Sequence, residues 1–314
     1  MSASIRPMTE ADRPAARRIV HTAFGTFLGA PNPENFWPDR DYVYGRFGAE
    51  HVASFTAEHD GEVVGSNFAV RWGSVGFFGP LSVRPDLWDR GIAQPLVRAV
   101  SDIFDDWRLS HTGLFTFPHS AKHIHLYGKF GFYPRFLTAI MTASAKSAAD
   151  AKHWSRYSGL SATDRCTAEA ACREVTDALH PGLDLGAEIR TVAARGLGDT
   201  LLLWEGASRL GGFAVCHWGP VSEAGRDFCL VKFGAVKPGA KAGEDFAALL
   251  DAGRALAAAV GMPNLLAGVN LGREEAYRRM QALGFRTLIQ GVTMHRPNDW
   301  GYSRSGLYVL DDWR

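Results

Sequence analysis

The chain has 314 residues, of which 46% are hydrophobic and 21% charged, with 34 basic and 33 acidic side chains. The length suggests two domains of an ordinary folded protein, and a net charge of +1 argues against partners such as nucleic acid or an anionic membrane. The sequence has no long apolar run, no secretion signal at its start and no cysteine pair with metal-ligand spacing, so we expect a cytoplasmic protein without a metal.

The first predicted elements are a helix, an irregular loop and a hairpin. Thr9 and Asp12 form a capping sequence, so a helix should begin there. Residues 25–41 contain several prolines, which predict a loop, and a short helix should follow around residues 42–47. Strand-like residues on both sides of Asp60-Gly61 predict a hairpin.

The stretch from Gly79 to Val100 predicts a binding site for a phosphate group. It begins as a strand, which Pro80 should interrupt with a bulge because proline cannot donate a ladder hydrogen bond. It then passes Asp89-Arg90-Gly91 and continues as an amphipathic helix. The first amide groups of a helix lack partners and attract an anion, and Gly91 lets a ligand approach closely.

Two motifs in this half of the chain resemble those of the GNAT family of N-acetyltransferases. Residues 88–93, Trp-Asp-Arg-Gly-Ile-Ala, resemble the acetyl-CoA loop Q/R-x-x-G-x-G/A, with Trp88 where Gln or Arg is usual. Residues 126–132, Leu-Tyr-Gly-Lys-Phe-Gly-Phe, are similar to the second signature, in which Ser120 stands for the usual Asn and His123 for the usual Ala. The two motifs follow one another in the order found in the family.

The resemblance implies an α/β (α+β) fold: a mixed, mostly antiparallel twisted sheet flanked by helices, in which two splayed parallel strands form the acyl-CoA cleft. It implies transfer of an acetyl group from acetyl-CoA, as cosubstrate, to a primary amine of a small molecule or peptide. By position, Tyr127 would be the general acid for the CoA thiolate. The residues expected to bind acetyl-CoA are Leu81, Ser82, Val83, Asp89, Arg90, Gly91, Ile92, Ala93 and Ser120.

The general base is not evident from the sequence. Residues 77–83 contain no carboxylate, although the resembled family often draws a Glu from this strand. His119, which follows the next predicted strand, is one candidate catalytic residue. Glu34, Asp39 and Asp41 of the proline-rich loop are others, because the resemblance implies that this loop covers the acceptor side of the cleft.

The second half of the chain repeats the first with changed residues. Val83-Arg84-Pro85 recurs as Val236-Lys237-Pro238, and Gly131-Phe132 recurs as Gly284-Phe285, both at an offset of 153 (236 − 83 and 284 − 131). The same offset places Glu244 at Gly91 and Met280 at Tyr127, so the repeat loses its phosphate site and its proton donor. We therefore predict a catalytic domain over residues 1–145 and a degenerate GNAT-like domain over residues 146–314, with the boundary in the small, polar segment 143–151.

Three functional hypotheses remain open at this stage. The first is an active N-acetyltransferase, and the second is a non-catalytic acyl-CoA sensor or scaffold. The third is an enzyme similar to the actinobacterial mycothiol synthases, which share a tandem arrangement. The sequence does not identify the acceptor amine, and whether the chain forms a homodimer also stays open.

Overall fold

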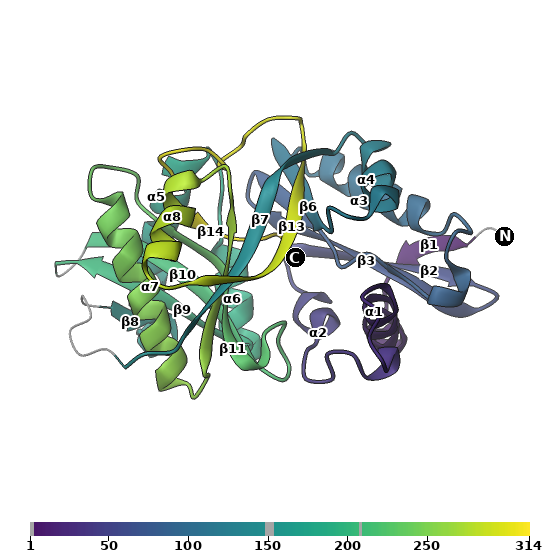
Figure 1. Cartoon of the computed structure of the whole chain (residues 1–314), viewed down its shortest axis with the longest axis horizontal. Helices are drawn as coiled ribbons and strands as arrows, with labels where there is room; N and C mark the ends of the chain where they lie inside the picture. The colour runs from purple at the N-terminus through teal and green to yellow at the C-terminus, as the bar shows by residue number, and fades with distance from the viewer. Residues whose placement is uncertain (1–2, 148–153, 207–208) are drawn as a thin grey trace.

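The computed structural model describes residues 3–147, 154–206 and 209–314, which form two lobes joined by one sheet (Figure 1). The sheet has 14 strands, and its main path runs β1-β2-β3-β4-β6-β13-β7-β12-β11-β10-β9-β8. The short strands β5 and β14 pair beside this path, with β3 and β11 respectively. A mixed sheet flanked by helices confirms the predicted fold class.

The first lobe has helices on both faces of its strands. Its elements are β1 (Ser4–Pro7), α1 (Arg13–Phe27), α2 (Tyr42–Arg46), β2 (Val52–His59), β3 (Glu62–Trp72), β4 (Val75–Phe78), β5 (Ser82–Val83), α3 (Ala93–Asp106), β6 (His111–Thr116), α4 (Ala121–Gly128) and β7 (Tyr133–Ser144). Helices α1 and α2 cover one face, and α3 and α4 cover the other (Figure 1). The predicted cap is present, since the Asp12 carboxylate accepts hydrogen bonds from both the amide and the hydroxyl of Thr9.

The second lobe repeats this order. Its elements are β8 (Trp154–Arg156), α5 (Ala162–Leu179), α6 (Gly186–Arg195), β9 (Gly198–Glu205), β10 (Arg209–Gly219), β11 (Gly225–Val236), α7 (Ala242–Ala259), β12 (Asn264–Asn270), α8 (Glu274–Ala282), β13 (Arg286–Arg296) and β14 (Val309–Leu310). Strands β12 and β13 and helix α8 each begin 153 residues after β6, β7 and α4 (264 − 111, 286 − 133 and 274 − 121). The duplication inferred from two short matches therefore extends to whole elements.

The two lobes exchange their last long strands. Strand β13 of the second lobe pairs with β6 of the first, and β7 of the first lobe pairs with β12 of the second. The two exchanged strands also pair with each other, and Figure 1 shows them crossing the middle of the molecule. Each lobe thus completes its sheet with a strand of the other lobe.

The predicted domain boundary, between residues 145 and 146, follows the end of β7 closely. Residues 143 and 144 of the predicted linker belong to β7, and residues 148–151 lie outside the described residues. Because of the strand exchange, the division at 145 remains a prediction about units of sequence and not a break in the sheet.

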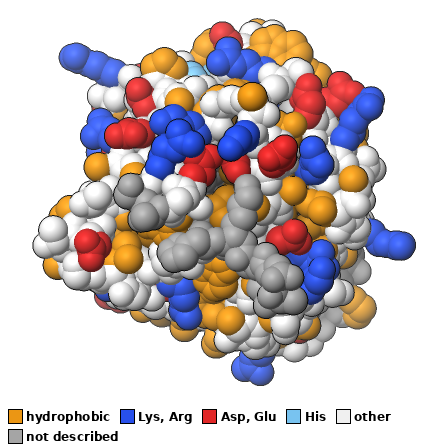
Figure 2. All heavy atoms as spheres, turned by 90° about the vertical axis from the view of Figure 1, so that its left-hand side faces the viewer, with side chains coloured by type: hydrophobic (Ala, Val, Ile, Leu, Met, Phe, Trp, Pro, Cys, Tyr) orange, Lys and Arg blue, Asp and Glu red, His pale blue; other side chains and the backbone are white. Residues whose placement is uncertain are grey.

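The end of the molecule formed by the second lobe carries a mixed surface. Figure 2 shows acidic and basic side chains next to one another on this face, with apolar side chains between them. In the described parts of the chain, no helix combines the length and the apolar character needed to cross a membrane.

Candidate active site

A gap opens in the first lobe where two parallel strands separate. Strand β4 pairs in parallel with β6 only as far as Phe78 and Leu114. Pro80 then follows, which has no amide hydrogen to donate to a ladder, and β5 pairs with β3 alone. The sequence predicted one strand with a bulge at Pro80, whereas the structure divides it into two strands, β4 and β5.

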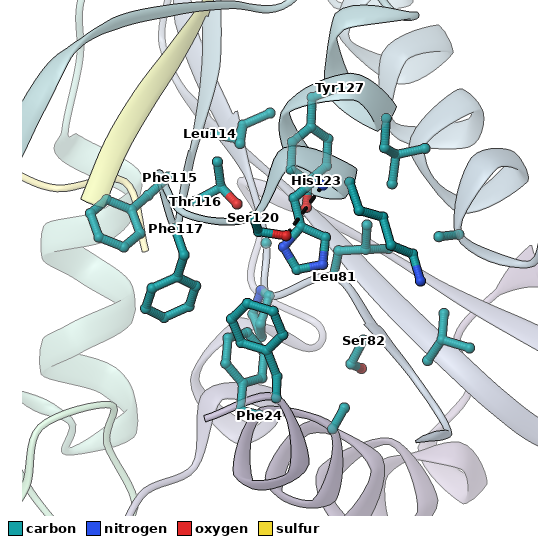
Figure 3. A pocket seen from close by; sticks show the side chains of 18 of the residues that line it. Phe24, Leu81, Ser82, Leu114, Phe115, Thr116, Phe117, Ser120, His123 and Tyr127 are labelled. Carbon is teal, nitrogen blue, oxygen red and sulfur yellow. Dashed lines mark hydrogen bonds between the residues drawn. The ribbon is translucent and has the colours of Figure 1, made fainter. Parts of the chain in front are cut away.

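A cavity of about 680 Å³ occupies this gap and continues toward α1 and α2. The predicted site residues that line it are Leu81, Ser82, Val83, Asp89, Gly91, Ile92, Ala93, Ser120 and Tyr127. Arg90 and His119, which the sequence also predicted, are exposed and do not contribute to this lining. Figure 3 shows Leu81 and Ser82 on one side of the cavity, with Phe115 and Phe117 on the other.

The loop before α3 is folded against the strand that precedes it. The indole nitrogen of Trp88 donates a hydrogen bond to the carbonyl of Val83 at 2.8 Å. Asp89 and Gly91 have φ angles of 64° and 80°, and a Cβ added at Gly91 would meet no atom within 4 Å. This conformation leaves open space beside the amides that begin α3, where a helix attracts an anion.

Lys122 contacts Asp89, which the sequence did not predict. Its ammonium group lies 2.5 Å from the Asp89 carboxylate, and it therefore connects the start of α4 to the loop before α3. Both side chains are more than half exposed, at 58% and 78%. No motif position marks Lys122, and only the spatial approach of α4 to the loop reveals it.

Helix α4 brings Tyr127 and Ser120 to the cavity. Ser120 is the N-cap of this helix, and its hydroxyl accepts a hydrogen bond from the amide of His123 at 3.4 Å (Figure 3). The Tyr127 ring packs edge-on against Phe78, with ring centroids 5.6 Å apart. Burial raises the pKa of Tyr127 well above its ordinary value of 10.0, so the phenol stays protonated at neutral pH.

His123 lies between the two sides of the cavity (Figure 3). Burial lowers its pKa from the ordinary value of 6.5, and the nearby positive charges of Lys122 and His119 lower it further. The imidazole is therefore neutral near pH 7 and can accept a proton. Its position four residues before Tyr127, on the same helical face, is the sequence signal that could have identified it.

The other candidate bases lie elsewhere. The ring of His119 stacks on that of Phe27, with centroids 5.7 Å apart, outside the cavity lining. Asp39 accepts a hydrogen bond from the amide of Arg226, and Asp41 caps α2 by accepting from two of its amides. Glu34 is not part of the cavity lining either.

In the second lobe, the corresponding gap holds a strand of the chain itself. Strand β14 pairs with Gly234 and Ala235, which correspond to Leu81 and Ser82 at the offset of 153 (234 − 81 and 235 − 82). The residue that corresponds to Ser120 is Arg273 (273 − 120 = 153). Its buried guanidinium donates to the carbonyl of Val309 at 2.7 Å and forms an ion pair with Asp311.

The phosphate-site loop is also changed in the second lobe. Helix α7 begins at Ala242, the residue that corresponds to Asp89 (242 − 89 = 153), so the equivalent of the loop is a helical turn. Phe246 takes the place of Ala93, and its buried ring lies 5.2 Å from that of Tyr308. Met280, in the place of Tyr127, is fully buried. The degeneracy of this half remains a prediction, and these are the structural differences that bear on it.

The comparisons with known proteins concern the family of the first lobe and the fold of the whole chain. Residues 17–132 match the profile of the Acetyltransferase (GNAT) family, whereas no curated protein matches the chain. A Pyrococcus horikoshii protein described as a candidate acetyltransferase is similar with a TM-score of 0.69 at 14% identity, covering 99% of this chain and 95% of that one.

Two further solved structures are similar over the whole chain. A GCN5-related N-acetyltransferase from Sphaerobacter thermophilus has a TM-score of 0.59 at 16% identity, covering 94% of this chain and 95% of that one. A tandem GNAT protein from the clavulanic acid biosynthesis pathway has a TM-score of 0.57 at 12% identity, covering 94% of this chain and 98% of that one. At identities this low, the three similarities show a shared fold and nothing more. Residues 17–132 of the first lobe therefore match the GNAT acetyltransferase family, and the chain as a whole has the fold of tandem GNAT proteins.

Proposed function

We propose that the first lobe transfers an acetyl group from acetyl-CoA to a primary amine, and that the second lobe has no such reaction of its own. The observation that carries this proposal is the difference between the two gaps. Leu81 and Ser82 face an open cavity, whereas their equivalents in the second lobe pair with β14. An extended ligand such as the pantetheine arm can pair with β5 in the same way that β14 pairs with β11.

The residues around the cavity fit the parts of acetyl-CoA. The amides that begin α3, with Gly91 and Ala93, would hold the diphosphate, as helix N-termini hold anions. Lys122 would shield the diphosphate from the charge of Asp89. Leu81 precedes the residues of β5 that pair with β3, so its amide can donate to the thioester oxygen and stabilise the negative charge that develops there.

The reaction exchanges a C–S bond for a C–N bond, and it needs two proton transfers: one from the amine and one to the CoA thiolate. The neutral amine attacks the thioester carbon, a C–N bond forms, the C–S bond breaks, and CoA leaves as a thiolate that must be protonated. Tyr127 would donate this proton, and the proposal is supported by its burial, which keeps the hydroxyl protonated. His123, with its lowered pKa, is the base that we favour for the proton of the amine.

The direct test combines acetyl-CoA with a panel of primary amines and measures thiol release, with binding of acetyl-CoA measured by calorimetry. We expect thiol release that depends on an amine. Binding of acetyl-CoA without thiol release on any amine would instead favour a non-catalytic sensor. Failure of acetyl-CoA to bind would contradict both functions.

A His123→Gln substitution should lower kcat/KM by about 100-fold, because glutamine cannot accept the proton. A base acts only when unprotonated, and the pKa of His123 lies below 6.5. Wild-type activity due to this group should therefore fall only as the pH drops below 6.5, and the variant should lose that dependence. The assay should use an acceptor whose amine has a pKa well below that of His123, so that the amine stays neutral while His123 titrates. His119→Gln is the matched comparison, and a larger loss in that variant would assign the base to His119.

A Lys122→Ala substitution should weaken acetyl-CoA binding by about fivefold at low salt, as expected for an exposed charge. Without Lys122, the Asp89 carboxylate stands unshielded beside the diphosphate. The difference from wild type should shrink at high salt because exposed charges are screened. Calorimetric titration at two salt concentrations measures it, with the exposed Lys237→Ala of the second lobe as control. Equal effects of the two substitutions would argue against a local role of Lys122.

A further inference from the structure

The part of the cavity beyond the thioester position has an aromatic lining. Phe24 and Phe27 come from α1, and Trp37 and Tyr42 come from the loop after α1 and from α2. Phe117 follows β6, and Trp313 comes from the end of the described chain, after β14. We call these six residues the aromatic wall. They converge from both lobes on the space that an acceptor must enter.

Five of the six rings of the aromatic wall contact another ring of the wall. Phe24 and Trp37 have centroids 5.8 Å apart, as do Trp37 and Tyr42, and the Phe27 and Phe117 centroids are 5.3 Å apart. These spacings are typical of attractive aromatic pairs. The wall is therefore a preformed apolar surface that an aromatic ring can contact without rearranging it.

Two strand glycines make room for rings that line the cavity. A Cβ added at Gly113 of β6 would lie 2.2 Å from the ring of Trp313. A Cβ added at Gly291 of β13 would lie 2.0 Å from the ring of Phe115, another cavity residue. A side chain at either position would displace the ring beside it. The two glycines therefore allow the strands to approach these rings closely.

The charged residues near the wall pair with one another. The Arg46 guanidinium and the Lys232 ammonium each lie 2.7 Å from the Glu223 carboxylate. Arg314, which lines the cavity, lies 3.0 Å from Asp312. Both carboxylates are already paired with cations of the protein, so neither is available to an acceptor with several ammonium groups. Each cation is paired as well, so none is available to the carboxylate of an acceptor.

We propose that the acceptor is an arylalkylamine: one primary amine on an uncharged body that carries an aromatic ring. This proposal rests on the proposed function, because it concerns the second substrate of the same site. The ring would lie against the aromatic wall, and its nitrogen would point toward His123 and the thioester. Trp313 makes the second lobe a contributor to the choice of substrate.

The test compares amines that differ in one feature. The probes are 2-phenylethylamine, ethanolamine, which lacks the ring, spermidine, which has extra charges, and phenylalanine, which adds a carboxylate. We expect kcat/KM for 2-phenylethylamine to exceed each of the others by about 100-fold or more, since even one methylene in an apolar pocket is worth about tenfold or more. Equal or better turnover of ethanolamine, spermidine or phenylalanine would overturn the proposal.

A variant of the wall adds a second readout. Phe24→Ala should lower kcat/KM for 2-phenylethylamine by about tenfold and change that for ethanolamine much less, because only the first substrate has a ring to lose contact. Phe136→Ala is the matched control, because Phe136 is 40% exposed, contacts Trp300 and does not line the cavity. An equal loss for both amines in Phe24→Ala would contradict the proposal.

Binding separates this proposal from the proposed function. Each amine is titrated into the protein saturated with CoA, so that no turnover is needed. Absence of thiol release with every amine would contradict acetyl transfer, while tighter binding of 2-phenylethylamine than of ethanolamine would still support the acceptor class. Equal affinities would overturn it. Faster turnover of hexanoyl-CoA than of acetyl-CoA would also overturn it, because the wall would then receive the acyl chain.

Discussion

A Gly91→Glu substitution should weaken acetyl-CoA binding by at least about 100-fold, which corresponds to about 2.7 kcal/mol. Two effects add. The new carboxylate would lie beside the proposed diphosphate site, where like charges repel. In addition, Gly91 has a φ of 80°, a backbone conformation that residues with a Cβ rarely adopt. Calorimetric titration with acetyl-CoA measures the loss.

The second lobe offers a matched control for this variant. Gly284 has a φ of 83°, and a Cβ added there would meet no atom within 4 Å, as at Gly91. Gly284→Glu therefore imposes the same strain and charge far from the cavity and should leave binding unchanged. Gly91→Ala separates strain from charge and should show a smaller loss than Gly91→Glu. Normal affinity in Gly91→Glu would remove the assignment of the diphosphate to the loop before α3.

The sequence predicted local features well because their signals lie within a few residues of one another. The cap at Thr9, the hairpin at Asp60-Gly61 and the strand interruption at Pro80 each depend on a short stretch of chain. The duplication was also visible, because the offset of 153 is kept from β12 through β13. Of the site residues that the sequence predicted, nine line the cavity.

The features that sequence reasoning missed depend on distant contacts. Strand β14 is only two residues long, and Val309 pairs with Ala235, which lies 74 residues earlier (309 − 235). So short a strand has no periodic pattern by which it could be predicted. Its role depends on the gap beside Gly234 and Ala235 of β11, which it fills. The exchange of β7 and β13 was likewise hidden, because both strands look the same in sequence whichever lobe they complete.

The choice between His119 and His123 shows the same limit. Sequence reasoning selected His119 because it follows a strand whose end should reach the cleft. In the structure, the Phe27 ring contacts both histidines, with centroids 5.7 Å from His119 and 5.0 Å from His123, and only His123 lines the cavity. Which of two nearby histidines enters a cavity depends on the packing of α1 against β6, and the sequence contains no direct signal for that packing.

A Tyr127→Phe substitution should lower kcat by about 100-fold, as expected for the loss of a general acid. The phenylalanine ring keeps the packing against Phe78 and Phe132, so only the hydroxyl is removed. Binding of acetyl-CoA should then stay close to that of wild type, because the hydroxyl acts on the departing thiolate and not on the bound ground state. Steady-state kinetics and calorimetry on the same preparation separate the two effects.

The pH dependence gives this role an independent check. A general acid works only while protonated, and burial places the pKa of Tyr127 above 10.0, so its loss of a proton should cause no decline in wild-type activity below pH 10. The control is Tyr157→Phe, which removes a hydroxyl bonded to Glu169 in the second lobe and should leave kcat unchanged. If Tyr127→Phe keeps full turnover while acetyl-CoA binds normally, the thiolate obtains its proton elsewhere. Water in the cavity is then the remaining donor, and Tyr127 serves only to pack α4 against β4.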